Sequence, residues 1–322
     1  MMDLISTLIA SATKAPSGHN TQPWKFFSSG SKITIRPDFS RRLDAVDPAD
    51  RELFISLGTA TENLVLAARS FEYQAAVRII ARETEPAVEI YLTREFSARV
   101  DWLAAIGSRQ VNRAAYTGQA IPEPEQRALQ AIAGEPGVRA TWVAAPADRL
   151  ALKELVRAGT AYQLADEAFK QELLDWLRLN DREIARHRDG LTYKTLGMPA
   201  LPGGWCGRLV VKNFLKPRVQ NADNDKKLDS APLWLVLATD RDDLISWINL
   251  GRSLQRVLLR ATQLGLAHSF FNQPFEVPEI RRRAARLKFI RGRYPSLLVR
   301  FGYAPVAPFS PRRLLSEIWP NS

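Results

Sequence analysis

The chain has 322 residues, 46 % hydrophobic and 25 % charged, with a formal net charge of +11. This length permits one large domain or two ordinary ones, and eight Trp and fourteen Phe argue against disorder. No apolar run reaches the roughly 18 to 20 residues of a membrane-spanning helix, so we expect no membrane partner. The single cysteine, Cys206, excludes an internal disulfide and suits a reducing compartment, which favours a cytoplasmic protein.

The first predicted element is an amphipathic helix. Residues 1–17 carry Asp3 and no basic residue ahead of their apolar stretch, unlike a signal peptide. Leu4, Ile5, Leu8 and Ile9 instead repeat with a helical period. The following segment, KFFSSGSKITIRPD (25–38), alternates around a Ser-Ser-Gly-Ser turn and predicts a β-hairpin.

Two predicted helices form an ungapped repeat. Residues 56–73 and 249–266 share identical residues at four positions, Leu57/Leu250, Gly58/Gly251, Leu66/Leu259 and Ala68/Ala261. Apolar residues in both fall three and four apart, and a glycine near each start permits close helix packing. A candidate strand follows each helix, at 75–80 and 268–271. The shared context predicts a duplicated half.

The other segments complete an α+β pattern. Buried strands are predicted at 87–93, 139–146, 233–239 and 294–303, and helices at 122–133, 148–187 and 242–265. We therefore expect a central mixed or antiparallel sheet wrapped by helices, in a single domain of two halves (about 1–100 and 101–322). The Pro- and Gly-rich stretch 198–232 has no clear period, so we expect an irregular insertion that is either a lid or mobile.

The positive charge has several candidate explanations. A pI near 10 would suit a phosphate-rich partner, but the arginines are scattered, and only 279–293 is densely basic. Apolar residues interleave with that cluster, so we expect a helix with a solvated basic face. No zinc-ligand spacing or RNA-binding signature accompanies it, and we expect no nucleic acid. A basic nucleic-acid-binding or surface-binding protein remains the second alternative function.

Several enzyme classes lack support. His19, His187 and His268 have no neighbouring Cys or carboxylate at metal-ligand spacing, so we expect no metal. GxSxG, Walker and GxGxxG motifs are all missing from the sequence.

The segment KAPSGHNTQPWKFF (14–27) concentrates a turn, a histidine and two amides ahead of apolar residues. It resembles the AP-S-x-x-N-x-QPW segment of the nitroreductase family, FMN-binding proteins of α+β fold. The resemblance implies that Pro16, Ser17, Gly18 and Asn20 face the flavin. Amide and hydroxyl groups on a tight turn can also meet the ring edge without charge. The alternative that the side chains of Asn20 and Gln22 only form hydrogen bonds with the backbone of the turn stays open. Trp24 is expected in the core.

Three further segments resemble the same family. SRQVNRAAYTGQAIPEP (108–124) is similar to its phosphate motif, which implies Arg109 and Arg113 as phosphate ligands. GYAPVAPFSPRRLL (302–315) is similar to the family's closing segment and adds Arg312 and Arg313. GLAHSFFNQPFE (265–276) occupies the stretch that crosses the flavin, with Phe270, Asn272 and Gln273 in place of the family's Pro, Glu and Gly.

The motif order is reversed relative to ordinary members, in which a homodimer shares each flavin. Together with the repeat, this order resembles the duplicated, single-chain branch of the family, which implies one flavin per chain and a monomer. The implied activity is hydride transfer from NAD(P)H through FMN to a small nitroaromatic or quinone-like acceptor, with no catalytic side chain. The alternative is a flavin-sequestering protein with a lid.

Overall fold

The computed structural model describes residues 2–95, 101–132 and 134–320. Its first half contains helix α1 (Met2–Ala12), the 3-10 turn η1 (Gly18–Asn20), strands β1 (Trp24–Ser29) and β2 (Lys32–Pro37), the turn η2 (Phe39–Arg41), helix α2 (Arg51–Ser70) and strands β3 (Tyr73–Ile80) and β4 (Ala87–Arg94). The predicted first helix and hairpin are both confirmed.

The second half repeats this plan. It contains α4 (Glu123–Gln130), β5 (Val138–Trp142), β8 (Leu233–Thr239), α11 (Leu244–Gln263), β9 (Ala267–Phe270) and β10 (Tyr294–Gly302). The two antiparallel sheets have strand orders β1-β2-β4-β3 and β5-β8-β10-β9. Strand, strand, helix, strand, strand therefore recurs with the same neighbours, which confirms the two pseudo-repeated halves. The strands form two sheets, one per half, and the expected boundary at residue 100 lies outside the described residues.

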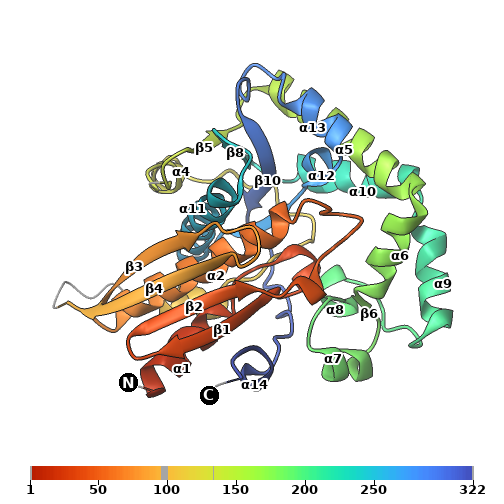
Figure 1. Cartoon of the computed structure of the whole chain (residues 1–322). Helices are drawn as coiled ribbons and strands as arrows, with labels where there is room; N and C mark the ends of the chain where they lie inside the picture. The colour runs from red at the N-terminus through yellow and green to blue at the C-terminus, as the bar shows by residue number, and fades with distance from the viewer. Residues whose placement is uncertain (1, 96–100, 133, 321–322) are drawn as a thin grey trace.

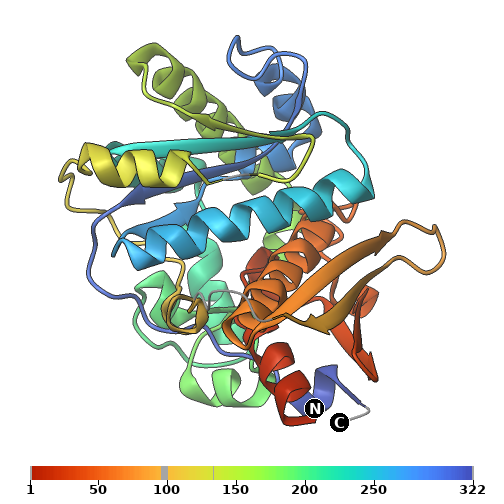
Figure 2. The ribbon, with the colours of Figure 1, turned by 90° about the vertical axis from the view of Figure 1, so that its left-hand side faces the viewer.

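Helices α2 and α11 lie side by side between the two sheets (Figures 1 and 2). They cross at the glycines of the sequence repeat. A Cβ on Gly58 would stand 2.1 Å from the Ile248 carbonyl oxygen, and a Cβ on Gly251 would stand 2.0 Å from the Ile55 carbonyl oxygen. Only glycine permits this approach, so the predicted role of the two glycines is confirmed.

A long insertion separates β5 from β8, where the first half has only the tight turn at residues 30–31. It contains α5 (Pro146–Ala165), α6 (Glu167–Asp175), β6 (Leu177–Arg178), α7 (Asp181–His187), β7 (Leu191–Thr192), α8 (Tyr193–Leu196), α9 (Trp205–Phe214) and α10 (Pro217–Asp229). Figure 1 shows α5, α6, α9 and α10 as an arch running down one side of the molecule. We call residues 146–229 the arch.

The prediction of an irregular stretch at 198–232 is wrong, because α9 and α10 occupy most of it. Helix α9 buries Gly207 and Val211 but exposes most of its apolar residues, with Trp205 76 % and Phe214 62 % accessible. Pro217 stands in the first turn of α10, where a missing N–H breaks no hydrogen bond. Proline and glycine here delimit helices and do not prevent them.

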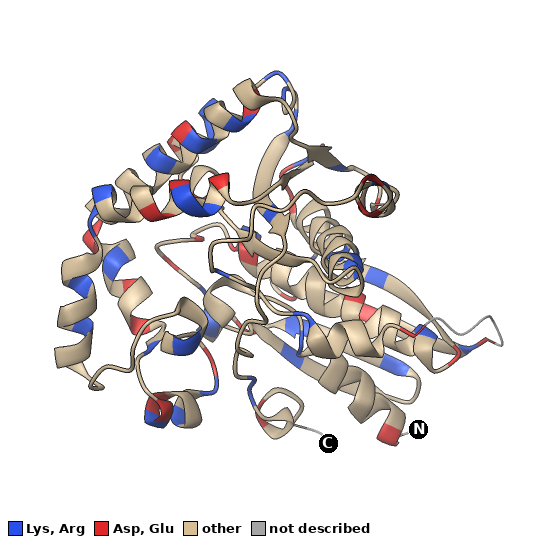
Figure 3. Cartoon of the chain, turned by 180° about the vertical axis from the view of Figure 1, so that it is seen from behind, with Lys and Arg blue, Asp and Glu red and all other residues tan. Residues whose placement is uncertain are grey.

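The remaining helices are α3 (Leu103–Ser108), α12 (Gln273–Glu276), α13 (Pro278–Ala284) and α14 (Leu315–Ile318). The basic cluster is helical only as far as Ala284, but Arg282, Arg283 and Arg286 are solvent-exposed as expected. Lys and Arg are spread over most elements (Figure 3). Within the described ranges, no helix is both long and apolar enough to cross a bilayer.

The C-terminal segment returns to the first half. Trp319 donates from Nε1 to Ser28 Oγ at 3.2 Å, and the two termini lie close together in both views (Figures 1 and 2). This return carries residues 310–313 to the turn at 14–22.

Candidate functional site

The turn before β1 has an uncommon backbone. His19, Asn20 and Gln22 have φ values of 46°, 56° and 53°, a region that non-glycine residues rarely adopt and that recurs at functional sites. Two hydrogen bonds hold the turn, since Gln22 N donates to Ser17 Oγ and Thr59 Oγ1 donates to the Pro16 carbonyl, both at 2.9 Å. The turn is therefore fixed against α2.

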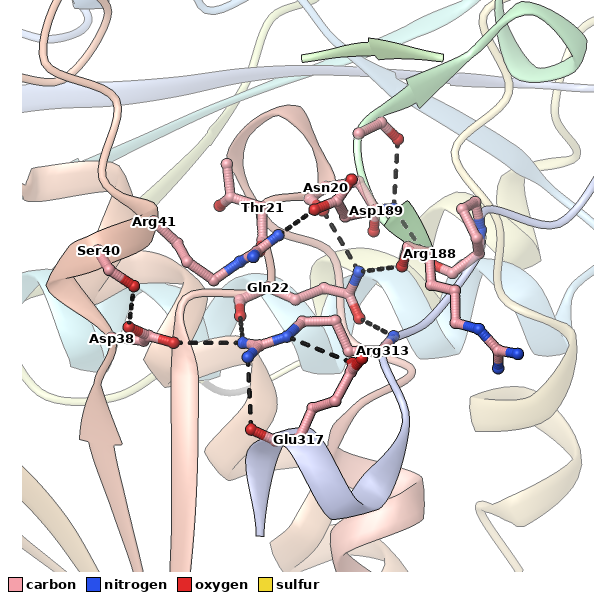
Figure 4. Close-up of polar contacts among 12 residues, drawn as sticks. Asn20, Thr21, Gln22, Asp38, Ser40, Arg41, Arg188, Asp189, Arg313 and Glu317 are labelled. Carbon is pink, nitrogen blue, oxygen red and sulfur yellow. Dashed lines mark hydrogen bonds and ion pairs between the residues drawn. The ribbon is translucent and has the colours of Figure 1, made fainter. Parts of the chain in front are cut away.

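The two amides of this turn connect three parts of the chain. Asn20 Nδ2 donates to the carbonyls of Gly190 (3.3 Å) and Pro311 (3.1 Å), and its Oδ1 accepts from Arg312 Nη1 at 3.0 Å. Figure 4 shows Gln22 between Arg188, whose carbonyl accepts from Nε2, and Arg313, whose backbone N–H donates to Oε1.

The Arg313 guanidinium has protein partners of its own. Arg313 Nη1 donates to the Gln22 carbonyl and forms an ion pair with Asp38 at 3.4 Å, and Ser40 donates to the same carboxylate (Figure 4). Beside it, Arg41 forms an ion pair with Asp189 of the arch. These bonds fasten the C-terminal segment and the arch to the turn.

Beside the turn lies a cavity of about 290 Å³, near the lower end of the usual range for small-molecule sites. The first half contributes Pro16, Ser17, Gly18, His19, Glu52, Ile55, Ser56 and Thr59. The second half contributes Arg113, Leu254, Phe270, Asn272, Gln273, Glu276 and Leu297. The arch contributes Thr160, Gln163, Leu164, Phe169, Leu173, Leu191, Leu215, Gln220 and Asn224. The cavity is therefore enclosed by both halves and the arch.

Three arginines near the turn, the buried Arg109 and the half-buried Arg113 and Arg312, lack a carboxylate partner among the described residues. Arg109 Nη2 donates to the Lys14 carbonyl at 2.7 Å, while its Nε and Nη1 are buried without a partner in the described chain. Arg312 Nη2 donates to the same carbonyl at 3.0 Å, and its Nε likewise has no described partner. Arg113 lines the cavity, and its guanidinium bonds to no described residue.

Burial disfavours the charged form of these side chains. It lowers the pKa of Arg109 to about 9, with a further contribution from Arg312, and lowers the pKa of Arg113 and of Arg312 to about 10. All three remain cationic at neutral pH. Burial, and then the charge of Arg113, lowers the pKa of His19 to about 4. The turn therefore presents a concentrated positive charge that is not neutralised by an acid of the described chain.

A second charged group lies in the cavity wall. Glu52 is buried and Glu276 is half-buried, and removal from water raises the pKa of both carboxyls, that of Glu52 to about 8. Asn272 donates from Nδ2 to Glu52 Oε1 at 3.5 Å, and Gln163 donates from Nε2 to Glu276 Oε2 at 2.5 Å. The cavity thus has cationic donors in one part of its surroundings and weakly acidic carboxyls in another.

The sequence-predicted residues occupy three kinds of position. Those that line the cavity are Pro16, Ser17, Gly18, Arg113, Phe270, Asn272 and Gln273. Arg109 and Arg312 meet at the Lys14 carbonyl behind the turn. Asn20 and Arg313 bond to other parts of the chain and lie outside the described lining. Trp24 is fully buried in the core, as expected.

Sequence reasoning missed Glu52, Glu276, His19 and the arch residues. Glu52 and Glu276 resemble ordinary polar residues of α2 and α12 in the sequence, and only the tertiary fold brings them together. Nothing in the sequence of the QPFE segment distinguishes Glu276 from a glutamate on the surface.

The donor set suits a phosphate-bearing ligand. Guanidinium N–H groups match phosphate oxygens in geometry and charge, and buried, unpartnered arginine nitrogens leave such bonds unformed. The polar turn and the apolar wall beside it suit a flat ring with polar edges. The residues present therefore fit FMN.

The fold has two pseudo-repeated halves, and they meet at a cavity with arginines that no acid of the described chain neutralises. The chain is 30 % identical over 337 aligned residues to a Mycobacterium tuberculosis protein named "Putative NAD(P)H nitroreductase", and the match covers 99 % of this chain and 92 % of the relative. A second M. tuberculosis protein with the same description is 25 % identical over 98 % of this chain and 95 % of its own length. The chain belongs to the nitroreductase family, in its duplicated single-chain form.

Solved structures give weaker likenesses. An FMN-dependent nitroreductase from Mycobacterium smegmatis in complex with NADPH is 17 % identical, with a TM-score of 0.43 over 66 % of this chain and 94 % of that one. A nitroreductase from Bacteroides fragilis with bound FMN is 16 % identical, with a TM-score of 0.37 over 67 % and 94 %. No family model matches the chain. The family assignment rests on the M. tuberculosis relative, which is matched along almost its whole length.

Proposed function

We propose that the chain binds one FMN and transfers hydride from NAD(P)H, through the flavin, to a small nitroaromatic or quinone-like acceptor. Arg109, Arg113 and Arg312 would hold the phosphate. The turn at 16–18 and the segment at 270–273 would flank the ring, while Asn20 and Arg313 position the turn and the C-terminal segment. The names of the M. tuberculosis relatives agree with this proposal.

The observation that carries the proposal is the set of buried, unpartnered arginine nitrogens beside a cavity. A buried cation without a counter-charge is costly, and proteins retain one mainly where a ligand supplies the charge. Arg109 Nε and Nη1 and Arg312 Nε have no described partner, and Arg113 faces the cavity itself. A phosphate group would satisfy these donors.

Among its described residues, the second half offers no equivalent site. Its segment before β5, residues 134–137, corresponds to the turn before β1. There Glu135 forms ion pairs with Arg252 and Arg256 of α11, and both arginines also pair with the buried Glu62. The cations at this position are therefore already neutralised. This supports one flavin per chain, and the two halves in one polypeptide support a monomer.

The bound flavin would supply the hydride chemistry, and the side chains bind, orient and exclude water. The cavity face of the arch includes Leu164, Phe169, Leu173, Leu191 and Leu215. This apolar part of the cavity wall favours a flat, weakly polar acceptor over a charged one.

The first experiment is an absorption spectrum of the purified protein and of apoprotein mixed with FMN and desalted. We expect flavin bands that remain with the protein at about one FMN per chain. Anaerobic mixing with NADH or NADPH should then bleach these bands, and a quinone should restore them. Failure to retain FMN after reconstitution would remove the proposal and favour the basic-surface alternative.

The arch supports a second candidate, flavin sequestration. Leu215, Gln220 and Asn224 of the arch line the cavity, so a bound flavin would lie partly beneath them. A sequestering protein should release FMN slowly and show no bleaching with NAD(P)H, whereas a reductase should show rapid bleaching.

A further inference from the structure

Two glutamates from distant parts of the chain meet in the cavity wall. Glu52 stands in the first turn of α2 and Glu276 at the end of α12, and both line the cavity. Their carboxyl groups lie close enough for each to influence the pKa of the other, and both belong to the same stretch of cavity wall. Glu52 is also close to the turn, since its Oε2 lies 3.4 Å from the point where a Cβ on Gly18 would stand. The pair therefore adjoins the segment proposed to flank the flavin.

Neighbouring amides fix the orientation of both carboxyls. Asn272 Oδ1 accepts from Leu298 N at 3.1 Å, which directs Nδ2 toward Glu52. Gln163 Nε2 donates to Glu276. Each glutamate thus accepts a hydrogen bond from a neutral amide. The two carboxyl groups can still share one proton between them.

The surrounding charges favour a singly protonated pair. Arg51, next to Glu52, is the cation that faces both glutamates, and its Nη2 donates to the Phe275 carbonyl at 2.7 Å. Asp47 adds a third carboxyl to the same group, and Arg281 faces Arg51 from α13. One adjacent cation offsets one negative charge, and two carboxylates close together and away from water repel each other strongly.

An independent feature indicates a ligand at this wall. Gln273 lines the same cavity, and its Oε1 is buried without a hydrogen-bond partner in the described chain. A buried amide oxygen without a partner is costly, so a ligand donor is expected beside it. Gln273 and Glu276 belong to the same helix, α12.

We propose that Glu52 and Glu276 act together as the proton donor for the acceptor, a further role that rests on the proposed flavin chemistry. Two-electron reduction of a quinone to a hydroquinone consumes one hydride and one proton. The hydride brings both electrons from NAD(P)H by way of the bound flavin, and the shared proton goes to the quinone oxygen that does not receive the hydride. The pair is left doubly ionised and regains a proton from water.

The test separates the two half-reactions of the FMN-loaded protein in rapid mixing. The variants are Glu52→Gln and Glu276→Gln, with Glu89→Gln as the control, because this half-buried residue of the interior strand β4 lies outside the cavity lining. Reduction by NAD(P)H should stay within about threefold of wild type, while reoxidation by a quinone should slow roughly a hundredfold, the usual effect of losing a general acid. Wild-type reoxidation should slow above about pH 8, and the variants should lose this dependence.

The apoprotein gives an independent readout. Infrared difference spectra between wild type and Glu52→Gln should show a protonated carboxyl at pH 7 that disappears near pH 8. Unchanged quinone rates and pH profiles in both variants, with FMN binding and NAD(P)H reduction intact, would overturn the acid pair alone. Wild type that binds no FMN would overturn both the proposed function and this inference.

Discussion

Replacing Arg109 by Met should strengthen the apoprotein and weaken FMN binding at the same time. The change keeps an unbranched side chain of similar length and removes a buried cation. Burial lowers the Arg109 pKa from 12.5 to about 9, which corresponds at neutral pH to a penalty of up to about 5 kcal/mol for holding the charge. Removing the charge relieves this penalty, but losing the hydrogen bond to the Lys14 carbonyl destabilises the variant by roughly 1.5 to 3 kcal/mol. A net stabilisation of the apoprotein by about 1 to 3 kcal/mol is expected.

The same substitution removes a charge-assisted phosphate contact, which should weaken FMN affinity roughly ten- to a hundredfold. The assay combines apoprotein unfolding in denaturant with an FMN fluorescence titration, and the matched control is Arg283→Met on the exposed face of α13. A destabilised Arg109→Met apoprotein that binds FMN as tightly as wild type would refute the reasoning. Arg109 would then be a structural arginine whose hydrogen bond to Lys14 outweighs its desolvation.

Three further results are expected. Trp24→Ala should lower apoprotein stability by about 3 to 5 kcal/mol in denaturant unfolding, because Trp24 is fully buried in the core, and a loss below about 1 kcal/mol would contradict that packing. Gly58→Ala should destabilise the protein by at least about 1 to 3 kcal/mol because its methyl group would meet the Ile248 carbonyl, whereas Gly30→Ala, at a tight turn with open space, should cost less in the same measurement. Folding raises the pKa of Glu52 from 4.5 to about 8, so its contribution to stability is present below about pH 4.5 and is lost as pH rises toward 8. The slope is up to about 1.4 kcal/mol per pH unit. The free energies of unfolding at pH 6 and pH 8.5 should therefore differ less for Glu52→Gln than for wild type.

The elements that follow a local rule could be predicted from the sequence. The strand at 233–239 is a continuous apolar run and is buried at every residue of β8. Gly58 and Gly251 were recognisable because the two repeat helices align without gaps and match one glycine with the other. Their close packing follows from the absence of a side chain. The turn at 14–22 was recognisable because its sequence resembles the family's AP-S-x-x-N-x-QPW segment, whereas the positive φ values of His19, Asn20 and Gln22 follow no rule visible in the sequence.

Tertiary placement of charge could not be predicted. Arg300 is fully buried in β10, where it donates to the carbonyls of Lys227 (2.5 Å) and Ala114 (2.6 Å) and lies 3.8 Å from the centre of the Tyr116 ring. In the sequence it is one arginine among many. These partners come from two other segments of the chain, so no local pattern identifies them. The Glu52–Glu276 pair was hidden for the same reason.

The amide of Asn20 shows a different limit. The motif drew attention to this residue, but the residue type does not specify whether its amide contacts a ligand or the chain. In the structure it bonds to the arch, the C-terminal segment and Arg312. Its assigned contact with the flavin stays a prediction.

The insertion between β5 and β8 has a consequence for how such a protein can change over generations. In a symmetric homodimer every substitution or insertion appears twice, because both subunits are read from one gene. Here the two halves are encoded separately, and one retains a two-residue turn at 30–31 while the other carries the whole arch. Each half can therefore accumulate mutations that the other never inherits, so the cavity could gain an asymmetric cover without any change to the matching edge of the opposite sheet.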